Sequence, residues 1–151
     1  MQLSTIKKQL MPILVSELAG CIVGIVSVVY IAHKMGASHE VVLSLASKSV
    51  TTPIAMEVTK AIGGIPSLTA AVVVGVGLMC AVCGYRTMGF ARVKSPVAQG
   101  LSMGTAAHAL GTVTSMDRSQ LHGAYASLGL TVNGIFTSLL TPVIIPLLGV
   151  G

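Results

Sequence analysis

Charged residues are scarce in this chain of 151 residues: Asp, Glu, Lys and Arg together make up 9% of it, against about 25% in a typical soluble domain. So few charges cannot cover a water-facing surface, which excludes an ordinary soluble globular domain. Intrinsic disorder is excluded too, because it requires low hydrophobicity and 53% of this chain is apolar. Tryptophan is absent and aromatic residues amount to 3%, so the chain offers no stacking platform for nucleic-acid bases.

Chemical motifs are equally scarce. The three cysteines all lie in apolar runs, and Cys80 and Cys83 form a C-x-x-C pair, a spacing that can indicate metal or redox chemistry. No second pair completes a zinc site, which favours two small residues on a lipid-buried helix. The sequence shows no nucleophile–base pattern and no phosphate-binding loop, and we expect neither an enzyme nor a bound metal or cofactor.

Long apolar runs and 17 glycines dominate what is present, and the mean hydropathy is +0.89. Three runs, 11–32, 65–85 and 124–148, are long enough to cross a hydrocarbon core of about 30 Å as helices. We therefore expect an all-α, polytopic integral membrane protein in the lipid bilayer, with residues 1–151 forming a single membrane domain. Glu17 lies inside the first run, where a carboxylate must face protein, water or headgroups.

Two further segments do not read as simple spans. Residues 39–62 contain two helical stretches of 9 or 10 residues around a polar break at 48–53, and each stretch covers about half a bilayer. Residues 96–111 form a helix of about 24 Å, slightly short of a span. Both segments are predicted to be discontinuous or re-entrant, which is tolerated only where protein or a water-filled cavity surrounds the backbone.

Basic residues orient the chain. Lys7, Lys8 and the loop at 86–94 are its most basic flanks, and the positive-inside rule puts both on the cytoplasmic side of a cell (inner or plasma) membrane. An even number of crossings must then separate them, which favours a re-entrant hairpin at 39–62. No convincing internal repeat is evident in the sequence.

The polar break at 48–53 is the first candidate site. Its lysine, its hydroxyls and the free N–H groups of the following half-helix can bind an anion, with Lys48, Ser49, Thr51, Thr52 and Pro53 as the candidate substrate-binding residues. The alternative is an ordinary loop with a capping Thr52 and an interfacial Lys48. Glu57 can carry a proton or bind a cation, or it can form a local ion pair with Lys60.

The segment 100–111 is the second candidate. Small residues form one of its faces, and a polar stripe runs beside that face. We expect the small face to pack against another helix and the polar stripe to bind substrate or move a proton. The packing residues are Gly100, Gly104, Ala107 and Gly111. The binding residues are Thr105, His108 and Thr112. The alternative for His108 is a structural histidine that is hydrogen-bonded to a neighbouring helix.

These two segments resemble the signatures of the LrgB/CidB family of membrane proteins. The first signature covers Lys48-Ser49-Val50-Thr51-Thr52-Pro53-Ile54-Ala55-Met56-Glu57 with Gly63-Gly64-Ile65-Pro66, and the second covers Gly104-Thr105-Ala106-Ala107-His108-Ala109-Leu110-Gly111-Thr112. The resemblance extends over nearly the whole chain and includes Gly123-Ala124. It implies either a transporter of small organic acid anions such as pyruvate, glycolate or glycerate, or an antiholin-like regulator of murein hydrolase export and autolysis.

The resemblance also implies a smaller LrgA/CidA-type membrane partner, and a homo-oligomer is possible. Two departures from the family stand out. Family members usually carry further hydrophobic segments before the run at 11–32, so we expect this chain to be the C-terminal portion of an LrgB-like protein. A fragment, a misassigned start and a truncated gene product all fit that expectation. Glu17 occupies a position where the family leads us to expect an apolar or small residue.

Overall fold

The computed structural model describes residues 2–149, with side chains from residue 10 onward, and within that range it consists of helices and their connections. The helices in chain order are α1 (Gln2–Lys34), α2 (His39–Ala46), α3 (Thr52–Ala61), α4 (Pro66–Phe90), α5 (Pro96–Arg118) and α6 (Gln120–Leu147). Three stretches, Leu10–Lys34, Pro66–Phe90 and Gln120–Leu147, are long and apolar enough to span a membrane. The predicted all-α multi-pass membrane protein is confirmed.

Some helices are longer than the hydropathy pattern predicts. Helix α4 continues to Phe90 instead of ending near Tyr85, and the chain turns only where Arg92 takes a left-handed φ of 57°. Helix α6 begins at Gln120 instead of 124, because the Ser119 hydroxyl caps it by accepting the His122 N–H at 3.3 Å. Local capping therefore sets these ends, and hydropathy alone does not reveal them.

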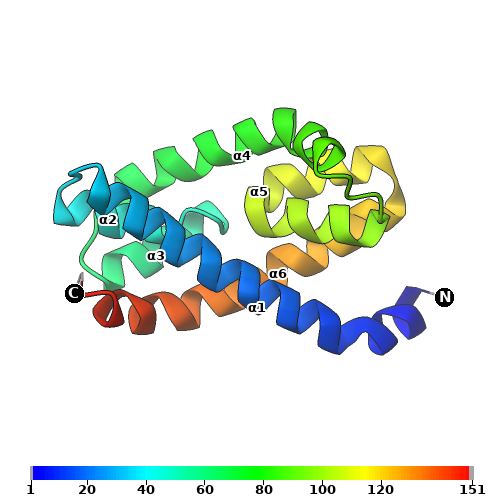
Figure 1. The fold of residues 1–151 in the computed structure, drawn as a ribbon, viewed down its shortest axis with the longest axis horizontal. Helices are drawn as coiled ribbons and strands as arrows, with labels where there is room; N and C mark the ends of the chain where they lie inside the picture. Colours follow the sequence, from blue (N-terminus) through cyan, green and yellow to red (C-terminus); the bar gives the residue numbers. More distant parts are fainter. Residues whose placement is uncertain (1, 150–151) are drawn as a thin grey trace.

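Helices α2 and α3 form a re-entrant hairpin that starts and finishes at the end of the molecule where α1 ends (Figure 1). Hydrogen bonds join its two arms: the Ser47 hydroxyl donates to the Ala55 carbonyl at 3.1 Å and lies 2.9 Å from the Thr59 hydroxyl. At the base of the hairpin, the Ser44 hydroxyl accepts the Ile65 N–H at 2.8 Å. Residues 47–51 form the tip, which points into the molecule.

Helix α5 is the second hairpin, and it enters from the opposite end (Figure 1). The chain reverses at His108, whose φ of 45° and ψ of −130° break the helix into two arms. The first arm begins beside the start of α6, where the Gln99 side-chain oxygen accepts from His122 Nε2 at 3.0 Å. The second arm ends beside α4, where the Tyr85 hydroxyl donates to Ser115 at 2.9 Å. Both predicted discontinuous segments are thus re-entrant.

The fold contains an inverted repeat that the sequence does not make evident. Helix α1 followed by the α2–α3 hairpin has the same order as α4 followed by the α5 hairpin, but the two units run in opposite directions (Figure 1). Lys48 and His108, at the two breaks, lie 60 positions apart (108 − 48), as do Thr52 and Thr112. Few other residues match at this offset, so geometry defines the repeat more clearly than identity does.

The start of α1 and the α4–α5 connection lie at the same end of the molecule (Figure 1). An even number of membrane crossings therefore separates the start of α1 from the loop at 86–94, as the basic flanks predict. The side chains of Lys7 and Lys8 lie outside the described residues, and the side of the membrane that this end faces stays a prediction.

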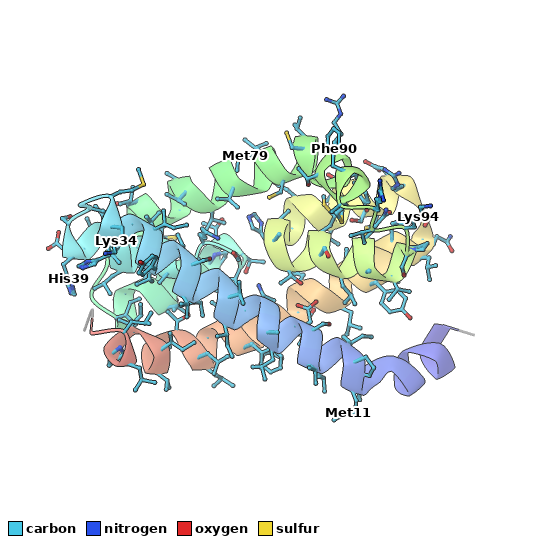
Figure 2. The ribbon with its side chains drawn as sticks, in the orientation of Figure 1. Met11, Lys34, His39, Met79, Phe90 and Lys94 are labelled. Carbon is cyan, nitrogen blue, oxygen red and sulfur yellow. The ribbon has the colours of Figure 1, made fainter. Side chains whose placement is uncertain are left out.

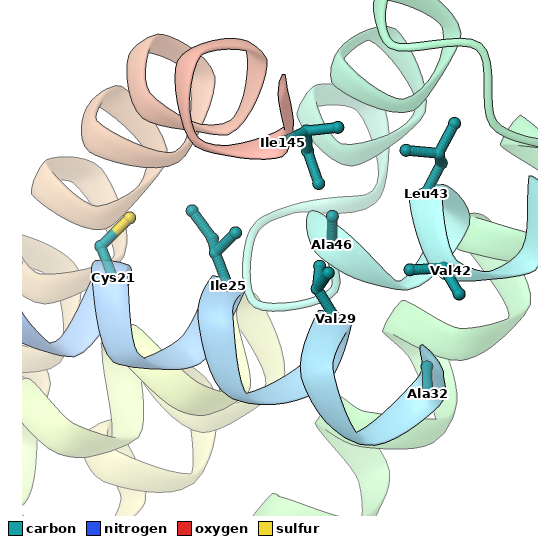
Figure 3. Close-up of a cluster of buried hydrophobic side chains, with 8 residues drawn as sticks. All are labelled: Cys21, Ile25, Val29, Ala32, Val42, Leu43, Ala46 and Ile145. Carbon is teal, nitrogen blue, oxygen red and sulfur yellow. The ribbon is translucent and has the colours of Figure 1, made fainter. Parts of the chain in front are cut away.

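The main apolar core lies where α1, α2 and α6 meet. Figure 3 shows Ile25 and Val29 of α1 beside Ala46 of α2 and Ile145 of α6. Apolar side chains also cover the outside of the molecule, where Met79 and Phe90 project from α4 with exposed fractions of 63% and 89% (Figure 2). An exposed apolar belt of this kind is suited to lipid.

Candidate functional site

The two hairpin tips meet at Asn133, near the middle of α6. Its side-chain amide donates to the Ser49 carbonyl at 2.8 Å and to the Thr105 carbonyl at 3.1 Å. Asn133 is 1% exposed, so these bonds satisfy backbone groups that the irregular tips would otherwise leave unpaired inside the membrane. Its Oδ1 atom is buried without a hydrogen-bond partner among the described residues. One side chain thus joins both halves of the inverted repeat.

A cavity of about 780 Å³ lies beside this junction, between α1, the two tips and α6. Most of its wall is apolar. Its ionisable lining residues are Glu17, Cys21 and Lys48. Its other polar lining residues besides Asn133 are Ser16, Ser49, Ser95, Ser102, Thr105 and Thr137. The volume is in the usual range for small-molecule sites, and an apolar wall with few convergent polar groups is typical of them.

Lys48 and Ser49 are the predicted site residues that the first tip contributes to the cavity. The Lys48 ammonium donates to the Ser49 hydroxyl at 3.2 Å, and both side chains are half-buried. Thr51 lies against α6 outside this cavity, and Thr52 and Pro53 are absent from its lining. Glu57 is exposed on α3, away from the cavity. The structure therefore brings together only part of the predicted set.

Of the second candidate set, Thr105 lines the cavity. His108 is 4% exposed and points to α4, where its Nε2–H donates to the Val73 carbonyl at 2.9 Å. Thr112 is also buried and donates to the His108 carbonyl at 3.0 Å. His108 therefore holds the second tip against α4, while the bond of Thr112 stays within α5, and this arrangement favours the structural alternative considered for the histidine.

The left-handed φ of His108 permits a specific prediction. Such a conformation costs a non-glycine residue about 1–3 kcal/mol, and glycine adopts it freely. Replacing His108 with alanine or with glycine removes the bond to Val73 equally, so the difference between the variants isolates the backbone. We expect His108→Gly to be more stable than His108→Ala by about 1 kcal/mol or more in thermal unfolding in detergent. Equal stabilities would contradict this backbone geometry.

The small-residue face of α5 is used within the chain. A Cβ added at Gly100 would lie 2.5 Å from the His122 carbonyl of α6, and one at Gly104 would overlap the Ala126 carbonyl. Ala107 is fully buried, and Gly111 lies against the Met103 carbonyl, so the two arms of the hairpin also approach closely.

Sequence reasoning did not select two central residues, Asn133 and Glu17. Asn133 is a lone amide within an apolar run, and such a group needs a partner inside the membrane. Glu17 is the acidic residue inside the first apolar run. Its proximity to Thr105 cannot be inferred from the sequence, because the two residues are 88 positions apart.

Comparison with known proteins identifies the family. A model of the LrgB-like family matches residues 1–147. The chain belongs to the LrgB-like family. Its relatives include an uncharacterised protein of Haemophilus influenzae, which is 38% identical over 147 residues, 97% of this chain and 64% of the relative. The antiholin-like protein LrgB of Bacillus mycoides is 33% identical over 148 residues, 98% of this chain and 64% of the relative.

A third relative, the uncharacterised protein YxaC of Bacillus subtilis, is 31% identical over 140 residues, 93% of this chain and 61% of that protein. The chain thus spans less than two thirds of the length of these LrgB-like relatives. No solved structure matches it. The family is one of membrane proteins and is not a known enzyme family. Among the described residues, no cluster of three or more His, Cys, Asp or Glu is placed to hold a metal ion.

Proposed function

We propose that this chain forms the substrate-binding part of a membrane carrier for small organic acid anions, of the pyruvate, glycolate or glycerate class. One observation carries this proposal: the tips of the two re-entrant hairpins, one from each unit of the inverted repeat, meet at Asn133 beside a cavity. Carriers built from inverted repeats bind their substrates where interrupted helices meet near the bilayer midplane. The carrier lies in the cell (inner or plasma) membrane, with the start of α1 and the loop at 86–94 facing the cytoplasm.

The chemistry of the cavity favours an anion with a second polar group. Among the described residues, the Lys48 ammonium is the cation that lines it, and it can pair with a carboxylate in a charge-assisted contact. The hydroxyl of Ser49 can serve a neighbouring hydroxyl or keto oxygen of the substrate, since a hydroxyl both donates and accepts. The remaining apolar wall suits a short carbon chain.

The test is uptake of labelled pyruvate and glycolate into vesicles that carry the chain. Loss of one charge-assisted contact costs about 1.5–3 kcal/mol, so we expect Lys48→Met to lower uptake about tenfold or more. Lys60→Met is the matched control, because Lys60 is exposed on α3 and lies outside the cavity. Equal uptake by the Lys48→Met variant and the wild type would remove Lys48 from the substrate site.

A second candidate function is antiholin-like regulation of murein hydrolase export and autolysis through assembly with an LrgA/CidA-type partner or with further copies of the chain. The name of the Bacillus mycoides relative supports it. Thermal stabilisation separates the two functions, because a ligand that binds the folded state raises its stability. A carrier should be stabilised by pyruvate or glycolate, whereas a protein that acts only through assembly should not.

A further inference from the structure

Glu17 is the buried acidic side chain of the proposed substrate cavity. It is 3% exposed, lines the cavity from α1, and lies beside the tip of the second hairpin. None of the residues with described side chains (10–149) forms an ion pair with it. An unpaired carboxylate is costly at this depth in a membrane, so its hydrogen bonding indicates which form of the group the fold accommodates.

The contacts of Thr105 fit a protonated Glu17. The Thr105 hydroxyl oxygen lies 2.6 Å from Glu17 Oε2 and 2.8 Å from the Leu101 carbonyl oxygen. A hydroxyl has one hydrogen to donate, and neither a carbonyl nor an ionised carboxylate can supply another. If Glu17 is protonated, its O–H donates to Thr105, and the Thr105 O–H donates to Leu101. Both short contacts are then hydrogen bonds with a hydrogen of their own.

Among the residues with described side chains, few other titratable groups lie around Glu17. The α2–α3 tip contributes Lys48, and α1 itself contributes Cys21, one turn further along. On α6, Tyr125 packs against Ile13, one turn before Glu17, and Asn133 and Thr137 are neutral. The part of α5 that lines the cavity carries serine and threonine as its polar residues and no charge. Among the described side chains, Lys48 is therefore the cation that shares the cavity with Glu17.

We infer that Glu17 takes up the proton that accompanies the organic acid anion through this cavity. The inference rests on the proposed transport function and adds its coupling ion. When the cavity holds neither proton nor substrate, the Glu17 carboxylate and the Lys48 ammonium sum to zero charge. Proton binding gives the form that the Thr105 contacts fit and leaves the Lys48 ammonium to attract the anion. In the loaded cavity, the substrate carboxylate and Lys48 sum to zero, and Glu17 is neutral because a proton has bound to its carboxylate oxygen.

Both states thus avoid a net charge in a medium of low dielectric constant, where such a charge is costly. The proton comes from water on the acidic side and leaves to water on the other side together with the anion. One proton moves with one monocarboxylate, and the step is electroneutral. Proton binding also completes the Glu17–Thr105 contact, which links the charge of the cavity to the position of the second hairpin.

The experiment uses the full chain in liposomes under an inward pH gradient of one unit, with the membrane potential clamped to zero. One coupled proton then supports about tenfold accumulation of labelled pyruvate or glycolate, since one pH unit is worth 1.36 kcal/mol. Glu17→Gln keeps the shape and a donor for Thr105 but cannot release a proton. We expect it to exchange internal for external substrate at equal pH and to lose gradient-driven accumulation.

Glu40→Gln is the matched control, because Glu40 is exposed in the first turn of α2, and it should accumulate substrate as the wild type does. Accumulation by Glu17→Gln equal to that of the wild type would overturn the inference and leave the transport function standing. Absence of both exchange and accumulation in the wild type would contradict transport itself.

Infrared spectroscopy tests the proton site independently of transport. A pH titration of the wild type should show the carbonyl band of a buried, protonated carboxylic acid disappearing as the pH rises. The band should be absent in Glu17→Gln and present in Glu40→Gln. If the band persists in Glu17→Gln, or the wild type lacks it, Glu17 is not the proton-binding group.

Discussion

Gly104→Ala should destabilise the chain by about 3 kcal/mol, at the upper end of the usual cost of overpacking. The added methyl group would overlap the Ala126 carbonyl and press on the backbone at Leu130. Backbone atoms of a helix cannot move aside as a flexible side chain can, so the second hairpin must separate from α6. Thermal unfolding in detergent measures the loss, and uptake should fall with it because the tip no longer reaches Asn133.

Gly75→Ala is the matched control. It also adds one methyl group to a helical glycine, but nothing lies within 4 Å of that Cβ position. Alanine favours the helix by about 1 kcal/mol over glycine, so this variant should be at least as stable as the wild type. If Gly104→Ala were equally stable, the close contact between α5 and α6 would be wrong.

Asn133→Leu should have the second large effect, because it removes both hydrogen bonds that join the hairpin tips. Leucine has the same number of side-chain heavy atoms as asparagine and the same branch at Cγ, but it leaves the Ser49 and Thr105 carbonyls without the amide that pairs them. A buried polar group left unpaired costs about 1–3 kcal/mol. We expect a loss of about 2 kcal/mol or more in thermal stability, and transport should be abolished even in the fraction that stays folded.

Thr131→Val provides the comparison for Asn133→Leu. Thr131 lies two residues away on α6, is exposed, and bonds only to the Ser127 carbonyl of its own helix among the described residues. Replacing it removes a polar group from the same helix without touching the tips. Similar stability and uptake in the two variants would show that Asn133 does not hold the junction together.

The spans and the break of the first hairpin were predictable from sequence because both are local properties of the chain. Apolar runs longer than about 20 residues specify spans. The polar break beginning at Lys48, with Pro53 beyond it, specifies a helix that cannot continue through lipid. The break at His108 is different: no proline or glycine marks the residue itself, and the helical pattern runs through it. Its left-handed backbone is held by the bond to Val73 on another helix.

The composition of the cavity was only partly predictable. Lys48, Ser49 and Thr105 could be selected because each lies in a polar stretch with a recognisable pattern. The contribution of Glu17 depends on which face α1 turns toward α5, and that register is set by packing between segments far apart in sequence. The same limit explains why Glu57, a carboxylate near the break, was an attractive candidate although it lies on the outer face of α3.

The most direct measurement of the central claim is substrate protection of a cysteine placed at the junction. In a background with Cys21, Cys80 and Cys83 replaced, Ser49→Cys lies in the cavity wall, whereas Ser38→Cys lies in the exposed connection between α1 and α2. We predict that pyruvate or glycolate slows modification of Ser49→Cys by a small cationic thiol reagent and leaves modification of Ser38→Cys unaffected. Unchanged modification of Ser49→Cys at saturating substrate would contradict a binding site where the two hairpins meet.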